Sequence, residues 1–152
     1  MRASAKTRYA MEAMVDMVMQ SVANPVVLRE IAQRQDISQN YLEQIFLQLR
    51  AAGLVRSVRG AGGGFVLARS PSDIRMAEIA AVLEGPIDLI GCVSDVGTCS
   101  RSVSCAVRQI WVEVGECMKK ALDSVTLQEV ADMQASKEAG ATPTEDKLRK
   151  RV

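Results

Sequence analysis

Hydrophobic residues recur every three or four positions through most of the first fifty residues, which is the spacing of amphipathic helices. They predict three helices, at about 6–22, 28–35 and 38–52. Ser38 is a suitable N-cap for the third helix, and Gly53 follows that helix where a left-handed C-cap is common. Its inner face consists of Leu42, Ile45, Phe46 and Leu49. The last two helices and their turn suggest a helix-turn-helix, but spacing alone fits an ordinary helical hairpin equally well.

After Gly53 the pattern changes to short β-rich runs. Two strands are predicted at 54–58 and 65–67, joined by a tip that contains Gly60, Gly62, Gly63 and Gly64. The tip lacks the Gly-Lys-Ser/Thr ending of a nucleotide-phosphate loop, and no helix follows it. A hairpin directly after a helix-turn-helix is a wing, and Arg56 and Arg59 make this one cationic, as suits a DNA minor groove.

The second half of the chain predicts a short helix that starts near Ile74 and ends at Gly85, and a long helix at about 104–125. Twenty-two residues span roughly 33 Å, longer than so small a domain needs for itself. The surplus apolar face therefore indicates a partner helix, and so a homodimer whose contacts include Ile110, Val114, Met118 and Leu122. Thr126 to Glu129 has the form of a capping box.

The predicted fold class is mainly α with a small β wing: a winged helix-turn-helix followed by a long C-terminal dimerisation helix. We expect a DNA-binding domain at 1–70, a cysteine loop and dimerisation region at 71–134, and a disordered polar tail at 135–152.

Composition and charge change this picture little. The 152 residues suit one domain or a small domain with an appendage. Residues 1–70 hold nine Lys or Arg against five Asp or Glu, a net charge of +4, whereas residues 71–152 hold ten against thirteen, a net charge of −3. A basic first half is compatible with a phosphate-facing surface. We expect no signal peptide, no membrane span and a cytoplasmic location, where thiols stay reduced.

Three segments, "TRYAMEAMVDM", "ISQNYLEQIFLQLRAAGLVRSVRGAGGGFVLAR" and the later cysteine cluster, closely resemble the IscR-like family of iron–sulfur cluster transcription regulators. The resemblance covers about residues 1–134 and is most specific over 37–67. It implies a homodimer that places helix 38–52 in the major groove of double-stranded DNA and the wing in the minor groove.

The outward residues at the start of helix 38–52 suit base reading. They are Gln39, Asn40, Glu43 and Gln44. Asn and Gln can read adenine, whereas Glu accepts from the cytosine amino group and repels acceptor-rich purine edges. Glu43 is thus the best candidate for rejecting wrong sequences, against the alternative of an ordinary surface carboxylate. Tyr41 is expected to pack at the helix start or to contact a phosphate.

Cys92, Cys99 and Cys105 lie close together in a chain without histidine. Four interpretations compete: buried structural thiols, a disulfide, a structural zinc site and an iron–sulfur cluster. Polar loop residues, reduced thiols and the missing CxxC pair argue against the first three. Thiolate-bound clusters tolerate irregular spacing, and the family resemblance falls on these cysteines. Without histidine no Cys–His nucleophile exists, and no carboxylate pair stands out, so we expect no enzyme.

The cysteine loop departs from the family pattern in two places. The first gap is six residues instead of five, and Arg108 stands where the family has a histidine ligand. A guanidinium has no lone pair for a metal. The fourth ligand, and the choice between a [2Fe-2S] and a [4Fe-4S] cluster, therefore stay open among Asp95, a group of the partner subunit, and a small thiol or water. Cys117 lies twelve residues beyond Cys105, roughly 18 Å along a helix, and should not reach.

The resulting hypothesis is a homodimeric regulator that binds palindromic DNA and senses iron–sulfur or redox status. Double-stranded DNA, a second copy of the chain and cluster-assembly proteins are the partners that this hypothesis implies. The alternatives are a regulator of the same fold that senses nitric oxide or another signal, and an iron–sulfur carrier that does not contact DNA. The sequence does not identify target genes, or whether binding activates or represses.

Overall fold

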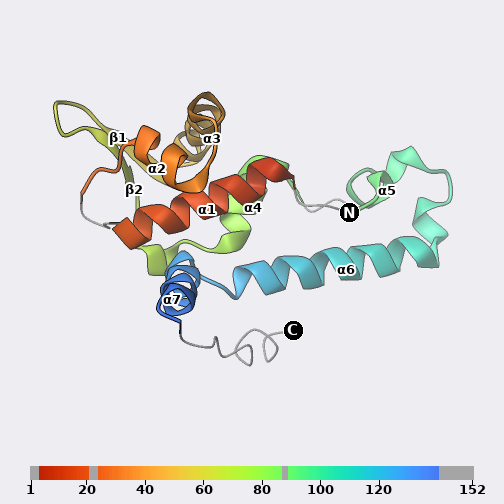
Figure 1. The fold of residues 1–152 in the computed structure, drawn as a ribbon. Helices are drawn as coiled ribbons and strands as arrows, with labels where there is room; N and C mark the ends of the chain where they lie inside the picture. The colour runs from red at the N-terminus through yellow and green to blue at the C-terminus, as the bar shows by residue number, and fades with distance from the viewer. Residues whose placement is uncertain (1–3, 21–23, 87–88, 141–152) are drawn as a thin grey trace.

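Helix α1 (Ala5–Gln20) lies at the centre of the fold, and four other helices pack against it (Figure 1). These are α2 (Leu28–Gln35), α3 (Gln39–Ala51), α4 (Met76–Glu84) and α7 (Leu127–Glu138). The computed structural model describes residues 4–20, 24–86 and 89–140. The fold is mainly helical with a two-stranded antiparallel sheet, as the sequence predicted.

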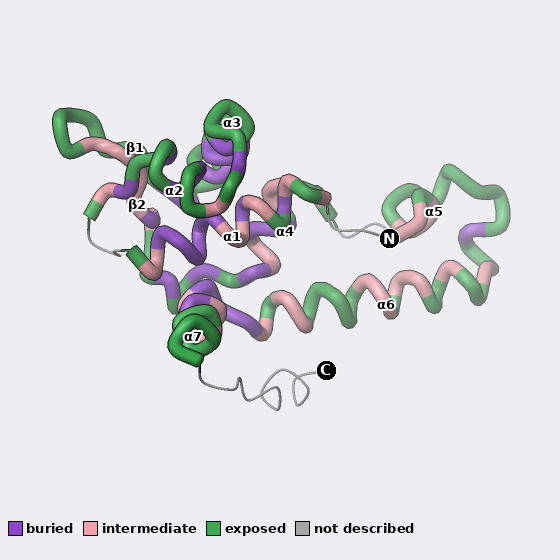
Figure 2. Tube along the Cα trace, viewed as in Figure 1, coloured by how far each residue is buried: buried purple, intermediate pink, exposed green. Residues whose placement is uncertain are grey.

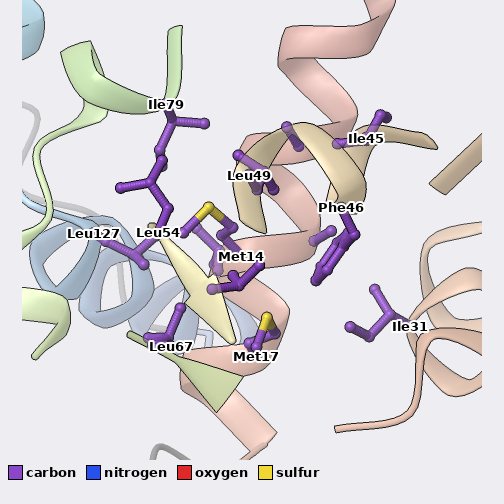
Figure 3. Close-up of a cluster of buried hydrophobic side chains, with 14 of the residues drawn as sticks. Met14, Met17, Ile31, Ile45, Phe46, Leu49, Leu54, Leu67, Ile79 and Leu127 are labelled. Atoms are coloured by element: carbon purple, nitrogen blue, oxygen red, sulfur yellow. The ribbon is translucent and has the colours of Figure 1, made fainter. Parts of the chain in front are cut away.

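The apolar stripe of α3 forms the centre of the core. Leu42, Ile45, Phe46 and Leu49 are each 0% exposed. Figure 3 shows several of them meeting Met14 and Met17 of α1 and Ile79 of α4. The prediction of this stripe is confirmed. The polar face of α3 is thereby turned outward, and Figure 2 shows the exposed surface of this helix on the side away from α1.

The predicted wing is present as strands β1 (Val55–Val58) and β2 (Gly64–Leu67), paired antiparallel with Val55 opposite Leu67. A third segment extends this sheet: Val26 and Phe65 exchange two backbone hydrogen bonds, each of 2.8 Å. Gly64 permits this close approach, because a Cβ on it would lie 2.5 Å from the carbonyl oxygen of Val26. The base of the wing is therefore fixed to the segment that leads into α2.

The turns around α3 largely follow expectation. Asp36 ends α2 in the left-handed region at φ 51°, and Gly53 follows α3 at φ 71°. Ser38 occupies the N-cap position, but its side chain makes no capping hydrogen bond. Helix α3 thus begins at the expected residue without a hydrogen bond from the Ser38 hydroxyl.

Polar contacts fix α1 to the helix-turn-helix. Arg34 of α2 donates to the buried carboxylate of Asp16 at 2.9 Å and 2.6 Å, and this pairing raises the pKa of Arg34. On α3, Gln48 accepts from Lys6 Nζ at 2.7 Å. These contacts set the orientation of α2 and α3 relative to the core.

The long helix α6 (Ala106–Asp123) has 18 residues and is shorter than the predicted 22. No residue of α6 is buried, and Figure 1 shows the helix extending away from the body of the molecule. Before it come α5 (Gly91–Ser94) and short 3-10 turns at Val96–Thr98 and Ser102–Ser104. A third 3-10 turn, Pro71–Asp73, precedes α4.

Helix α7 opens with the predicted capping box: Glu129 N donates to Thr126 Oγ1 at 3.1 Å, and Thr126 N donates back to the Glu129 carboxylate at 2.9 Å. The helix continues to Glu138, whereas we expected the polar tail to begin at residue 135. Residues 141–152 lie outside the described part of the chain. Among the described residues, no helix is long and apolar enough to cross a membrane.

Candidate nucleic-acid interface and cysteine loop

The outward face of α3 brings together the predicted base-reading residues. Gln39, Asn40, Glu43 and Gln44 are all exposed, within the first two turns of the helix. Gln39 Nε2 donates to the Glu43 carboxylate at 2.9 Å. This hydrogen bond between side chains one turn apart orients the carboxylate along the exposed face.

Tyr41 points sideways from the other four. Its ring meets that of Tyr9 on α1 edge to face, at a centroid distance of 6.0 Å and an interplanar angle of 89°. The Arg8 guanidinium carbon in turn lies 4.3 Å from the centroid of the Tyr9 ring. Of the two roles expected for Tyr41, the structure thus shows the packing role, with the side chain still 38% exposed.

The wing places its arginines at the surface. Arg56 in β1 and Arg59 at the tip are both exposed. The tip is tightly turned: Gly60 has φ 111°, and a Cβ on Gly63 would lie 2.5 Å from the Val58 carbonyl oxygen. The structure therefore presents a compact cationic hairpin beside α3, the arrangement of a winged helix (Figure 1).

The cysteine loop lies at the far end of α6 from α7 (Figure 1). Cys92 and Cys105 are half-buried and Cys99 is exposed. In the described part of the chain, no three His, Cys, Asp or Glu side chains come together in a way that would hold a metal ion. The donor types suit an iron–sulfur cluster, but in this structure the thiols do not converge on one point.

Arg108 links the loop to α6. Its Nε donates to the backbone carbonyl oxygen of Cys92 at 2.7 Å, and its Nη2 donates to that of Val93 at 3.3 Å. Arg108 thus cross-links α6 and the cysteine loop through hydrogen bonds. Sequence reasoning identified the substitution but missed these contacts, because they depend on how the loop folds back onto the helix.

A hollow of about 410 Å³ lies beside Cys105 and Arg108 at the start of α6. Ser102, which lines it, is 3% exposed, and its hydroxyl has no hydrogen-bond partner among the described residues. A buried hydroxyl normally has a hydrogen-bond partner, so Ser102 leaves one unsatisfied polar group at the wall of this hollow.

The predicted dimerisation residues lie along α6. Ile110 is 59% and Met118 38% exposed, whereas Val114 and Leu122 are half-buried. A groove of about 1250 Å³ adjoins the C-terminal part of this stripe, and its apolar lining includes Met11, Val15, Met19, Met118 and Leu122. Sequence reasoning missed the groove, because its walls come from five helices, α1, α2, α4, α6 and α7.

Glu84 ties one rim of this groove to the start of α1. Its carboxylate accepts from Ser4 N at 2.9 Å and from the Thr7 hydroxyl. Hydrogen bonding from the Ser4 side chain, the largest contribution, from the Thr7 hydroxyl and from the Ser4 backbone holds the pKa of Glu84 below its usual value. The end of α4, just before the cysteine loop, is thereby joined to α1.

The described fold, with its exposed polar recognition helix and cationic wing, defines a winged helix-turn-helix regulator. The family described as "Rrf2: Iron-dependent Transcriptional regulator" matches residues 3–133. The chain belongs to this family of DNA-binding transcriptional regulators and is not an enzyme.

Two groups of relatives are similar over nearly the whole chain. The HTH-type transcriptional regulator IscR of Escherichia coli O9:H4 (strain HS) is 37% identical, with 100% of this chain and 94% of that protein aligned. The structure of CymR, titled the global cysteine regulator of B. subtilis, matches with a TM-score of 0.73 and 37% identity over 87% of this chain and 97% of that one. That of T. potens IscR matches with a TM-score of 0.72 and 36% identity over 93% of both chains.

Proposed function

We propose that this protein is a homodimeric cytoplasmic regulator that binds palindromic DNA through α3 and the wing, and that its cysteine loop senses iron–sulfur or redox status. The observation that carries the DNA-binding part is the division of α3 into two faces. Its apolar stripe is fully buried, and its exposed side holds amide and carboxylate side chains beside the two wing arginines.

Binding by this surface combines two physical contributions. The exposed arginines of the wing attract phosphates without regard to sequence and release counterions. The amides of Asn40 and Gln44 form paired hydrogen bonds with adenine edges in the major groove, while Glu43 selects against purine edges that offer only acceptors. Packing of α3 against α1 holds these side chains in a fixed register.

The direct test is selection of binding sites from random double-stranded DNA by the purified protein, followed by titration of the enriched site at several salt concentrations. We expect an inverted repeat whose half-sites lie about one or two helical turns apart. We also expect a steep salt dependence and clear discrimination against scrambled DNA. Failure to enrich any sequence would remove sequence-specific DNA binding from the proposal.

The exposed stripe of α6 supports the homodimer. Val107 and Ile110 are 60% and 59% exposed, which is unusual for large apolar side chains that recur at helical spacing on one face. A second copy brings an identical stripe, so two such helices can cover each other about a two-fold axis. The adjoining groove gives the partner helix a further apolar surface to fill.

Thiolate chemistry and the relatives named IscR support an iron–sulfur cluster on Cys92, Cys99 and Cys105. For all three thiols to bind one cluster, the loop has to close from the arrangement described above. A relative titled a cysteine regulator has an equally similar fold, so the fold by itself does not select the signal. A carrier that does not contact DNA is disfavoured by membership of a DNA-binding family.

A further inference from the structure

Leu47 is exposed in the middle of the face that α3 presents to solvent. Its side chain is 54% exposed, whereas the four apolar residues of the inner stripe are 0% exposed. Residues at i, i+3, i+4 and i+7 share one side of a helix. Asn40, Glu43, Gln44 and Leu47 have this spacing, so the leucine lies on the same side as the predicted base-reading residues.

The neighbouring side chains of α3 do not cover Leu47. Tyr41 turns toward Tyr9, and Gln48 toward Lys6, so both face α1. Of the other exposed residues on this side of α3, Asn40, Glu43 and Gln44 are polar, and Ala51 carries only a methyl group. The Leu47 side chain therefore stays largely open to solvent on the side of α3 that carries the predicted base-reading residues.

We propose that Leu47 contacts the 5-methyl group of a thymine in the major groove and so selects that base at one position of each half-site. This inference rests on the proposed DNA binding. The thymine methyl is the one apolar group that base pairs offer in the major groove. Against any other base, the leucine would remove polar groups from water without replacing their hydrogen bonds, which is unfavourable.

Leu47 and Asn40 occupy different positions along the helix axis and therefore contact different bases. Leu47 lies seven residues after Asn40, about 10 Å along the helix axis. Successive base pairs are about 3.4 Å apart. Leu47 and Asn40 consequently face different base pairs, and the leucine adds specificity that Asn40 does not supply.

The test uses the full-length protein and the site enriched from random DNA. Each thymine of one half-site is replaced in turn by deoxyuridine, which pairs identically but lacks the methyl group. We expect one replacement to weaken wild-type binding about fourfold, the effect of removing one buried methyl group. The Leu47→Ala variant should bind the thymine and deoxyuridine versions of that position equally.

Val96→Ala is the matched control, since Val96 is 45% exposed but belongs to the loop at the other end of the molecule (Figure 1). It should keep the wild-type response to deoxyuridine. Circular dichroism of Leu47→Ala checks that α3 is intact, and Leu47→Gln, which keeps the side-chain length, should also lose the response. If wild-type protein tolerates every replacement, or if Leu47→Ala responds as wild type does, the inference is wrong while DNA binding stands. If no site is enriched, both fail.

Discussion

The Arg108 guanidinium is hydrogen-bonded to the backbone of Cys92: its Nε donates to the Cys92 carbonyl oxygen at 2.7 Å. A second bond, from Nη2 to Val93, makes the contact two-pronged. Because arginine stays protonated and has no lone pair for a metal, it holds the loop without serving as a ligand. Arg108 thus stabilises the cysteine loop through charge-assisted hydrogen bonds to its backbone.

The first prediction is that Arg108→Ala loosens the cysteine loop. Losing this contact should lower local stability by about 1 kcal/mol, which corresponds to about fivefold faster exchange of the amides of residues 91–98. Hydrogen–deuterium exchange followed by mass spectrometry measures this rate. Arg101→Ala, a change of an exposed arginine in the same loop, should leave exchange unchanged. Equal rates in wild type and Arg108→Ala would show that the contact does not hold the loop.

The second prediction concerns the thiols. After anaerobic reconstitution with iron and sulfide, Ala variants of Cys92, Cys99 and Cys105 should each lose the visible absorbance of an iron–sulfur cluster. Cys117→Ala should keep this absorbance. Cys117 is exposed on α6 and lies about 18 Å along the helix axis from Cys105, too far to share one cluster. Loss of absorbance in Cys117→Ala would refute the three-cysteine assignment. Stoichiometric zinc without sulfide would refute the cluster.

The helical core and the wing were predictable because local patterns determine them. The stripe from Leu42 to Leu49 follows helical periodicity, and Gly53 adopts the left-handed backbone that its position suggested. The pairing of Val26 with Phe65 was not predictable in this way, since it joins residues far apart in the sequence through backbone atoms.

The candidate sites were predictable in residue type more than in arrangement. Polarity alone identified the outer face of α3. The hydrogen bond from Gln39 to Glu43 could not be predicted, because it depends on the conformations of both side chains. In the cysteine loop, closely spaced thiols suggested a common ligand. The short turns between them nevertheless leave the thiols apart, and spacing does not specify how such turns fold.

The third prediction addresses the wing. Arg59→Ala should weaken binding to the selected DNA site by about 1–3 kcal/mol, the scale of a specific contact. Gel shift or fluorescence anisotropy at constant salt measures the change. Arg101→Ala removes the same charge at the opposite end of the molecule and should bind like the wild type. Unchanged affinity of Arg59→Ala would remove the wing tip from the interface.

The fourth prediction concerns selectivity at Glu43. Because its carboxylate repels acceptor-rich base edges, Glu43→Ala should bind a broader set of sequences and retain affinity for the original site. Repeating the site selection with this variant should give a less restricted base composition. Gln39→Ala removes the donor of the 2.9 Å hydrogen bond and leaves the charge of Glu43 in place. This variant therefore tests the hydrogen bond separately from the charge. Equal loss of all sites in Glu43→Ala would mean that the carboxylate is structural or contacts an essential base.

The last prediction concerns the dimer stripe on α6. Val114 lies between Ile110 and Met118 on the apolar side of the helix, and in the proposed dimer the partner helix covers it. Val114→Asp would bury an unpaired carboxylate there, at a cost of about 3–5 kcal/mol, so that the dimer dissociation constant rises at least about 100-fold. Sedimentation velocity over a range of concentrations measures this change.

Val112→Asp provides the matched comparison for the same prediction. Val112 is also half-buried, but it lies two residues away and so about 200° around the helix from Val114. The same carboxylate at that position should leave the dimer intact. Far-ultraviolet circular dichroism of both variants distinguishes a monomer from an unfolded chain. A Val114→Asp protein that remains folded and dimeric at low micromolar concentration would place the interface on another surface. The reason is that an unpaired carboxylate buried between closely packed helices strongly destabilises their association.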